Sequence, residues 1–599
     1  MSKILKLMKN HIPAVLLCVG LIMIQAWCDL ELPGLMSDIV DIGIVQGGVE
    51  NASQEYIAQV AAGQGDAGVQ MSYLWSTGGK MALVALIAVA VAVVVNYIAS
   101  RTAAQVGRDL RRSVFAKVLS FSHTELDQFS TASLITRSTN DIQQVQMVVV
   151  MLLRMVLLAP ILGIGGIIKV VNTKTGMGWI IVLAVVCIFV LVMLLMLIAM
   201  PKFKKMQTLV DNVNLVSREI LTGLPVIRAF HKEEYEEKRF DKANVELRDT
   251  QLFTGRTMAF MSPAMTILMN GISILIVWFG AKGVDLGNLA IGDMMAFMSY
   301  TMQIVMSFMM ITMISIMVPR AVVSAARIDE ILTSEQVIRE PDEAVVPETI
   351  TGSITFDHVS FKYPGAEDYA LRDITFTAQP GKTTAIIGST GSGKTTLLNL
   401  IPRFYDVTEG RVTLDGVDIR DMKLENLRDQ LGYVPQKAVL FSGTIESNIK
   451  YAGDVTDAEM HQAAAIAQST AFIEEKEQQY ASHIAQGGSN VSGGQKQRLS
   501  IARAVASRPK IYLFDDSFSA LDYKTDAALR KALAQNAGDA AVIIVGQRIA
   551  TVMHADNIIV LKDGVIDDMG THETLLKTCE TYKEIAVSQL SEKELGMEV

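Results

Sequence analysis

Apolar residues dominate the chain before about residue 320, in runs long enough to cross a hydrocarbon layer of about 30 Å. These runs predict six transmembrane helices, and they cover residues 13–33, 81–99, 147–171, 177–200, 258–281 and 291–318. Beyond Glu330 the composition changes to that of a soluble α/β domain. We therefore expect a six-helix transmembrane domain with long cytoplasmic extensions over residues 1–330, a linker over 331–350 and a second domain over 351–599.

Basic residues indicate which side of the membrane each connection faces. Lys and Arg are frequent in residues 101–146 and 201–257, whereas residues 42–78 contain neither. Because cytoplasmic connections carry the excess of Lys and Arg, both basic segments, both termini and the C-terminal domain are predicted to be cytoplasmic, on the cell (inner or plasma) membrane. Helical patterning continues into both segments, so we expect long helices whose tips, residues 121–134 and 221–230, contact the C-terminal domain.

The overall composition agrees with a membrane protein. Apolar residues make up 50% of the chain and charged residues only 19%. The net charge of −9 argues against nucleic acid as a partner. Lysines before the first apolar run resemble a signal peptide, but no small-residue cleavage site follows Ala26, which predicts a retained helix preceded by an interfacial segment. The four cysteines show neither a disulfide framework nor a metal-binding spacing.

The strongest chemical signal follows an apolar stretch, residues 383–387, that predicts a strand. The residues after it match the pattern G-x-x-x-x-G-K-[ST] and its flank: Gly388, Ser389, Thr390, Gly391, Ser392, Gly393, Lys394, Thr395 and Thr396. Glycines let backbone N–H groups and a following helix N-terminus surround phosphate oxygens. Lys394 is expected to reach the β- and γ-phosphates, and Thr395 to bind Mg²⁺. The chain is therefore predicted to bind a nucleoside triphosphate with Mg²⁺.

Other polar and aromatic residues are suited to the same ligand. Tyr363 offers a ring that could stack on adenine, and Gln436 ends a short apolar run from which it could reach Mg²⁺ or an attacking water. Residues 511–514 predict a buried strand, and the two acids that follow it, Asp515 and Asp516, form the arrangement that holds Mg²⁺ beside a phosphate loop.

A second phosphate-binding element lies farther along the chain. Ser492, Gly493, Gly494 and Gln495 open a predicted helix, so that its first N–H groups and the Ser492 hydroxyl could bind a phosphate. Asp522 lies farther along, soon after the acids. With the phosphate loop, this serine-glycine-glycine-glutamine element is the most specific combination in the sequence.

Over essentially its whole length the chain resembles an exporter-type half-transporter of the ATP-binding cassette (ABC) superfamily. The resemblance implies a membrane α-helical bundle of six transmembrane helices fused to an α/β P-loop nucleotide-binding domain. It also implies a domain-swapped dimer in which each of two ATP molecules lies between the phosphate loop of one subunit and the signature of the other. The roles it implies are adenine contact for Tyr363, phosphate and Mg²⁺ binding for Lys394 and Thr395, Mg²⁺ sensing for Gln436, the signature for 492–495, Mg²⁺ binding for Asp515 and a dimer contact for Asp522.

Two residues depart from the family pattern. Asp516 occupies the position of the glutamate that activates water, and Gln547 occupies that of the histidine that contacts the γ-phosphate. Aspartate is one methylene shorter, and a general base must lie within hydrogen-bond reach of its proton. Glutamine donates to phosphate but cannot carry a proton as histidine does. This pair resembles the noncatalytic site of heterodimeric exporters, which predicts a second half-transporter with catalytic Glu and His as partner; sequence drift in a working homodimer is the alternative.

Methionines mark the sixth apolar run at spacings of three and four, and Met298, Met302 and Met306 are candidate substrate contacts. Flexible methionines suit a surface that re-packs around varied apolar ligands, although they would also serve plain helix packing or face lipid. Asp29 is a candidate for binding cationic compounds. Asp29, Glu31 and Arg154 could pair with one another or line the cavity, and the two acids could instead lie near the outer interface.

These features predict an ATP-driven exporter of hydrophobic or amphipathic small molecules, of the multidrug type, in the lipid bilayer. Two other readings stay open. One is a lipid, peptide or siderophore transporter on the same scaffold, and the other is an ATP-gated regulatory or channel-like membrane protein.

Overall fold

The computed structural model describes residues 11–44, 67–173, 176–341, 343–345, 347 and 349–590. The chain divides into two compact units, one formed by Met1–Leu119 with Ala132–Ser334 and the other by Ser120–Thr131 with Glu335–Val599. The expected interfacial segment before the first transmembrane helix lies outside the described residues, as does the middle of the connection over residues 42–78.

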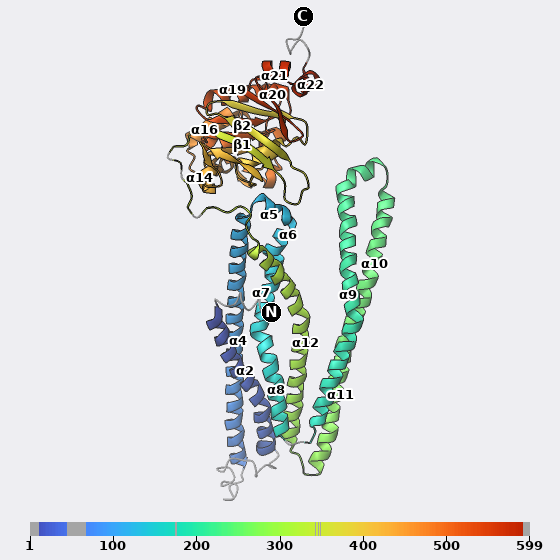
Figure 1. Cartoon of the computed structure of the whole chain (residues 1–599). Helices are drawn as coiled ribbons and strands as arrows, with labels where there is room; N and C mark the ends of the chain where they lie inside the picture. Colours follow the sequence, from blue (N-terminus) through green and yellow to red (C-terminus); the bar gives the residue numbers. More distant parts are fainter. Residues whose placement is uncertain are drawn as a thin grey trace. The chain divides into compact units, whose positions relative to one another are not determined.

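The first unit consists of helices, and six helical segments are long and apolar enough to cross a membrane, as predicted (Figure 1). The helices are α2 (Ile12–Asp38), α4 (Ala67–Leu119), α6 (Thr131–Thr136), α7 (Ile142–Met151), α8 (Leu157–Asn172), α9 (Gly178–Ala229), α10 (Glu233–Ala259), α11 (Met261–Asp285) and α12 (Ile291–Thr333). Helices α6, α7 and α8 form one segment through π-helical turns, and α10 continues into α11.

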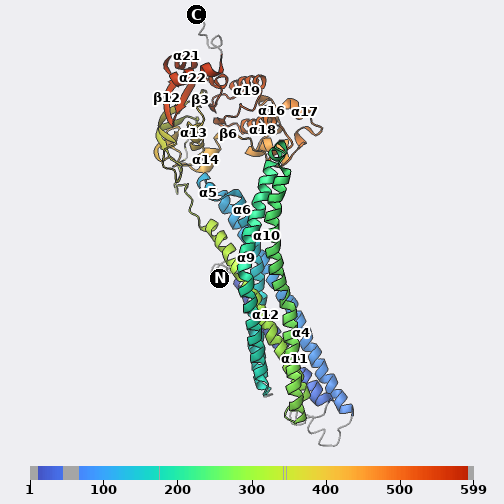
Figure 2. The ribbon, with the colours of Figure 1, turned by 90° about the vertical axis from the view of Figure 1, so that its right-hand side faces the viewer.

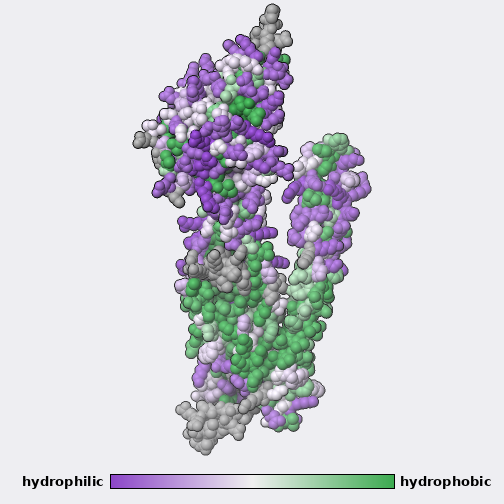
Figure 3. All heavy atoms as spheres, in the orientation of Figure 1, coloured by the Kyte–Doolittle hydropathy of each residue, from purple (hydrophilic) through white to green (hydrophobic). Residues whose placement is uncertain are grey.

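Apolar side chains cover the outside of this helical unit. Figure 3 shows a broad band of hydrophobic residues across the helices, with polar residues beyond it. Many large apolar side chains of these helices are exposed, among them Leu86, Phe189 and Ile274. A surface of this kind requires a lipid environment, because soluble proteins rarely expose apolar patches of more than a few hundred Å².

Two helices run well past their apolar stretches. Helices α9 and α10 lie side by side as a long antiparallel pair (Figures 1 and 2). The expected tip, residues 221–230, forms the last turns of α9 and its cap, since α9 continues to Ala229 and the chain reverses at His231, whose φ is 53°. Acids in the first turn of α10 favour the start of the next helix there, because negative charge stabilises a helix N-terminus.

The second unit contains an antiparallel sheet of order β2-β1-β4-β5 and a mostly parallel sheet of order β12-β11-β3-β10-β9-β6. Its strands are β1 (Ile354–Phe361), β2 (Leu371–Ala378), β3 (Thr383–Gly388), β4 (Glu409–Leu414), β5 (Val417–Asp418), β6 (Leu431–Val434), β7 (Gly443–Thr444), β8 (His483–Ile484), β9 (Ile511–Asp515), β10 (Ala541–Val545), β11 (Asn557–Lys562) and β12 (Val565–Gly570). Its principal helices are α13 (Lys394–Leu400), α16 (Asp457–Ile466), α18 (Gly493–Ala506), α19 (Tyr523–Asn536), α20 (Ile549–Val552), α21 (His572–Thr578) and α22 (Glu580–Gln589).

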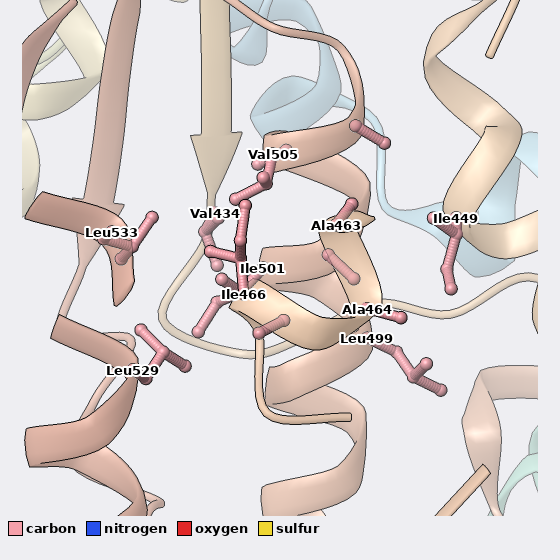
Figure 4. Packing of buried hydrophobic residues seen from close by; sticks show 14 of the residues in the cluster. Val434, Ile449, Ala463, Ala464, Ile466, Leu499, Ile501, Val505, Leu529 and Leu533 are labelled. Atoms are coloured by element: carbon pink, nitrogen blue, oxygen red, sulfur yellow. The ribbon is translucent and has the colours of Figure 1, made fainter. Parts of the chain in front are cut away.

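The parallel sheet is covered on both faces. Every residue of β9 and β10 is buried, as expected for near-continuous apolar runs in a central parallel sheet. Figure 4 shows one of the clusters that cover it, with Leu499, Ile501 and Val505 of α18 packed beside Ile466 of α16 and Val434 of β6. This packing fixes the direction of α18, whose first turn carries the predicted signature.

A short helix from the middle of the chain belongs to this second unit. Helix α5 (His123–Gln128) stacks the His123 ring on Phe404 at 4.5 Å, and Asp127 accepts a hydrogen bond of 3.1 Å from the Tyr405 hydroxyl. Glu125 is buried and accepts hydrogen bonds from Ser122 and from the backbone N–H of Val337. The predicted contact between the first tip and the C-terminal domain is thereby confirmed.

Candidate functional site

The predicted nucleotide residues follow neighbouring strands of the parallel sheet. Strands β3, β10, β9 and β6 are adjacent and parallel. The phosphate loop follows β3, Gln547 follows β10, Asp515 ends β9 and Gln436 lies shortly after β6. Because the carboxyl ends of parallel strands meet at one edge of a sheet, these side chains gather in the crevice where α/β proteins bind ligands.

The phosphate loop has a backbone that only glycine can supply at its end. Gly393 has a φ of 98°, and a Cβ added there would lie 2.7 Å from the Leu371 side chain. The Lys394 ammonium donates hydrogen bonds to the carbonyl oxygens of Gly388 and Ser389 at 2.9 and 2.7 Å. Burial lowers the pKa of Lys394. A phosphate bound beside it would have the opposite effect and favour the charged form.

Thr395 and Asp515 fit the predicted Mg²⁺ ion. The Thr395 hydroxyl donates to Asp515 Oδ1 over 3.0 Å, which brings together two of the oxygen donors that Mg²⁺ prefers. Burial is the main cause of a raised pKa at Asp515, and a neighbouring cation would favour the carboxylate. When bound, Mg²⁺ neutralises charge on the transferring phosphate.

Asp516 lies between the two glutamines that the sequence placed near the γ-phosphate. Its Oδ2 accepts hydrogen bonds from Gln547 at 3.0 Å and, more weakly, from Gln436 at 3.5 Å. Its backbone is left-handed, with a φ of 45°, which is uncommon outside glycine and frequent at active sites. Burial raises the pKa of this carboxyl group above its ordinary value. The structure therefore brings both departures from the family pattern into direct contact.

Tyr363 lies beside the phosphate-loop helix. Its hydroxyl is 2.9 Å from Thr396 Oγ1, and its ring meets Tyr405 edge-on at 5.3 Å. The partly buried ring is fixed by these neighbours next to the loop that receives the phosphates.

The signature residues cap α18 on an exposed surface. Ser492 accepts from the Gln495 backbone and Gln495 accepts from the Ser492 backbone, which makes a complete capping box. A Cβ at Gly493 would meet no atom within 4 Å, so the fold of this chain does not require glycine there. Asp522 in turn caps α19 and accepts from the Thr525 backbone at 3.0 Å. Since the packing of this chain leaves room for a side chain at Gly493, close approach of a ligand to the backbone is a use of glycine that fits this position.

One residue of this site carries no sequence signal. Gln589, at the end of α22, donates to the Gln547 carbonyl oxygen and accepts from the Ile549 N–H, both over 2.8 Å. A single glutamine near the end of a chain matches no motif, and only the fold shows that it contacts the loop after β10.

The candidate substrate residues lie in the helical unit. The backbone carbonyl of Asp29 in α2 accepts a hydrogen bond of 2.8 Å from the Gln303 amide of α12. Met302 and Met306 are exposed on α12, while Met298 is half-buried and lines a cavity of about 820 Å³ beside Trp278 of α11.

Two further charges of this unit do not pair with Asp29. Glu31 forms an ion pair with Lys169 of α8 at 2.5 Å, and the Arg154 residue is exposed. The hypothesis that Glu31 pairs with Asp29 or Arg154 is therefore wrong, because Lys169 neutralises it from the neighbouring helix.

Fold and site together define a P-loop nucleotide-binding domain carried by six transmembrane helices. The ABC transporter transmembrane region model matches residues 15–308, and the ABC transporter model matches residues 371–519. The chain belongs to the ABC transporter family. It is a multi-pass membrane protein of the exporter type, an ATPase coupled to transport that uses ATP with Mg²⁺, and exporters of this family act as dimers.

Relatives match nearly the whole chain. An uncharacterized ABC transporter ATP-binding protein of Mycobacterium tuberculosis is 40% identical over 98% of both chains. An ATP-dependent lipid A-core flippase of Pseudomonas aeruginosa is 30% identical over 83% of this chain and 82% of its own. A bacterial Atm1-family ABC exporter solved with ATP bound has a TM-score of 0.77 at 25% identity, covering 98% of this chain and 99% of its own.

Proposed function

We propose that this chain is one subunit of a heterodimeric, ATP-driven exporter of hydrophobic or amphipathic small molecules, of the multidrug type. Its own phosphate loop, Asp516 and Gln547 form a noncatalytic ATP site. Its signature completes the catalytic site of a second half-transporter that carries Glu and His. The complex lies in the cell membrane, with both termini and the nucleotide-binding domain in the cytoplasm.

The contact between Asp516 and Gln547 carries this proposal. A catalytic acid-base group needs a partner that can hold and release a proton, and an amide does neither. Here the amide of Gln547 donates to Asp516, the carboxylate in the position of the water-activating base. Such a pair stabilises a bound nucleotide through hydrogen bonds while providing no proton relay, so ATP persists in this site.

Two exposed features support a partner subunit. Ser492 and Gly493 lie on the surface, and a Cβ at Gly493 would meet no atom of this chain within 4 Å. An exposed position of this kind is accessible to a nucleotide bound by another chain. The last turns of α9 and its cap expose Leu221, Val226 and Phe230, and Figure 3 shows hydrophobic residues at the end of the α9–α10 pair. Apolar side chains at the end of a polar hairpin suit a contact with the nucleotide-binding domain of the partner.

The nucleotide left on the complex after turnover tests the proposal. When the purified complex is photolabelled with azido-ATP carrying a radioactive α-phosphate and allowed to turn over, label on this chain should remain ATP, and label on the partner should become ADP. The two chains separate on a denaturing gel, and each nucleotide is identified by chromatography. A complex of this chain with itself that converts all bound label to ADP would overturn the assignment.

The substrate class rests on the exposed face of α12 and the acid next to it. Met302 and Met306 present flexible thioethers, and Gln303 between them contacts the backbone of Asp29. An apolar, re-packing face with one carboxylate suits hydrophobic compounds, including cations. The flippase among the relatives handles a lipid, which makes an amphipathic lipid the second candidate.

Substitutions on this face should change substrate preference rather than ATP hydrolysis. Met298→Ala, Met302→Ala and Met306→Ala reshape the surface and should shift the ranking of substrates in a transport assay while basal ATPase activity is kept. Asp29→Asn should reduce transport of a cationic compound roughly threefold against a neutral analogue, about 0.7 kcal/mol, as for a partly exposed ion pair. A parallel fall for every substrate that follows the folded yield would show that these residues only pack.

A further inference from the structure

The loop after β10 is held by the last helix of the nucleotide-binding domain. The Gln589 side chain ends in an amide, whose NH₂ group and carbonyl oxygen both bond to this loop. Its Nε2 donates to the carbonyl oxygen of Gln547 at 2.8 Å, and its Oε1 accepts from the N–H of Ile549 at 2.8 Å. The amide thus bonds to the backbone of the residues before and after Arg548, as a neighbouring strand would.

The helix that carries Gln589 is a firm support. Helix α22 packs on β3, β11 and α20 through the fully buried Tyr582 and Ala586. The Tyr582 hydroxyl lies 2.7 Å from His572 Nδ1, and the Cys579 side chain caps the start of α22. Because the helix is anchored to the strand that precedes the phosphate loop, a bond from Gln589 ties the Gln547 backbone to the same rigid body.

The side chain of Gln547 remains free to change partners. Its backbone carbonyl is held by Gln589, whereas its exposed amide donates to Asp516. We infer that Gln589 is a positioning residue for the γ-phosphate contact: it holds the backbone of Gln547 so that the amide can turn from Asp516 to the terminal phosphate of ATP. This inference rests on the proposed role of Gln547 as the residue that recognises that phosphate.

Discrimination between ATP and ADP tests the inference, because only ATP has the phosphate that Gln547 would contact. In the assembled complex, photolabelling of this chain by azido-ATP is competed with unlabelled ATP or ADP. Gln589→Ala should lower the preference for ATP over ADP roughly three- to tenfold, the effect of about one lost hydrogen bond. Gln589→Glu should lower it at least as much, because a carboxylate would oppose the Gln547 carbonyl oxygen.

Ser588→Ala is the matched control, since Ser588 is an exposed neighbour on α22 whose hydroxyl bonds only within its own helix, to the Ile585 carbonyl. It should leave the preference unchanged, and all variants should keep the unfolding temperature of the parent. An unchanged preference in both Gln589 variants, or a loss of ATP and ADP binding in equal measure, would overturn the inference. Gln547→Ala separates the two claims. If this variant keeps the preference for ATP over ADP, the proposed role of Gln547 is wrong. If Gln547→Ala loses the preference but Gln589→Ala keeps it, only the positioning role of Gln589 is refuted.

Discussion

Ser492→Arg should lower ATP turnover by the complex at least about a hundredfold, while ATP stays bound at the phosphate loop of the same chain. Ser492 is exposed at the N-terminus of α18, where its hydroxyl and the first N–H groups face outward. Arginine would place bulk against the phosphates held by the partner and remove the cap of α18. A hundredfold loss corresponds to about 2.7 kcal/mol in the barrier.

The two effects are separated by measuring turnover and nucleotide binding on the same preparation. Steady-state phosphate release reports the partner's catalytic site, and photolabelling of this chain reports its own loop. Ser507→Arg, near the far end of α18, serves as the control for a large cation on the same helix. Selective loss of the nucleotide bound near Lys394 would show that the signature acts within its own chain.

Asp516→Asn should leave most of the ATPase activity of the complex, whereas replacing the partner's glutamate should nearly abolish it. The Asp516 side chain is one methylene shorter than the glutamate of the family pattern, and the Gln547 amide beside it cannot relay a proton. Asparagine keeps the size of the side chain and removes only its charge. We expect a change of less than about threefold for Asp516→Asn, below 0.7 kcal/mol in the barrier, against at least about a thousandfold for the partner's glutamate.

The control for this comparison is Asp515→Asn in the same chain. Asp515 is bonded to Thr395 in the predicted Mg²⁺ site, so its loss should weaken nucleotide binding at this site. Equal and severe losses of turnover from Asp516→Asn and from the partner variant would show that this chain is itself catalytic. The asymmetric assignment would then be abandoned.

The sequence predicted those parts of the molecule that local chemistry specifies. Long apolar runs predict helices in lipid, and the glycine pattern of the phosphate loop predicts a strand, a turn and a helix. The observed strand β3 and helix α13, which begins at Lys394, frame the loop as expected. Part of the site could be assembled from motifs because the phosphate loop, Asp515 and Gln547 end or follow adjacent strands of one parallel sheet, whereas the signature opens helix α18.

Contacts between distant segments could not be predicted. The hydrogen bonds of Gln589 join residues that share no pattern, and the left-handed backbone of Asp516 depends on its place between β9 and the loop after β10. The exact residue of the α9–α10 reversal could not be predicted either, since helical periodicity continues through residues 221–229 and only the acids of α10 mark the new start. Such features depend on contacts between distant segments, which the pattern of a single sequence does not reveal.

The docking of α5 has a consequence for synthesis of the protein. Asp127 and Tyr405 are 278 positions apart, so at roughly 5–20 residues per second the ribosome needs roughly 14 to 56 s to supply the partner of this hydrogen bond. During that interval the His123 ring lacks the Phe404 ring on which it stacks. Membrane insertion of the early helices therefore precedes completion of their cytoplasmic tip, and a chain that ends before residue 405 should present an uncovered α5 to chaperones and proteases.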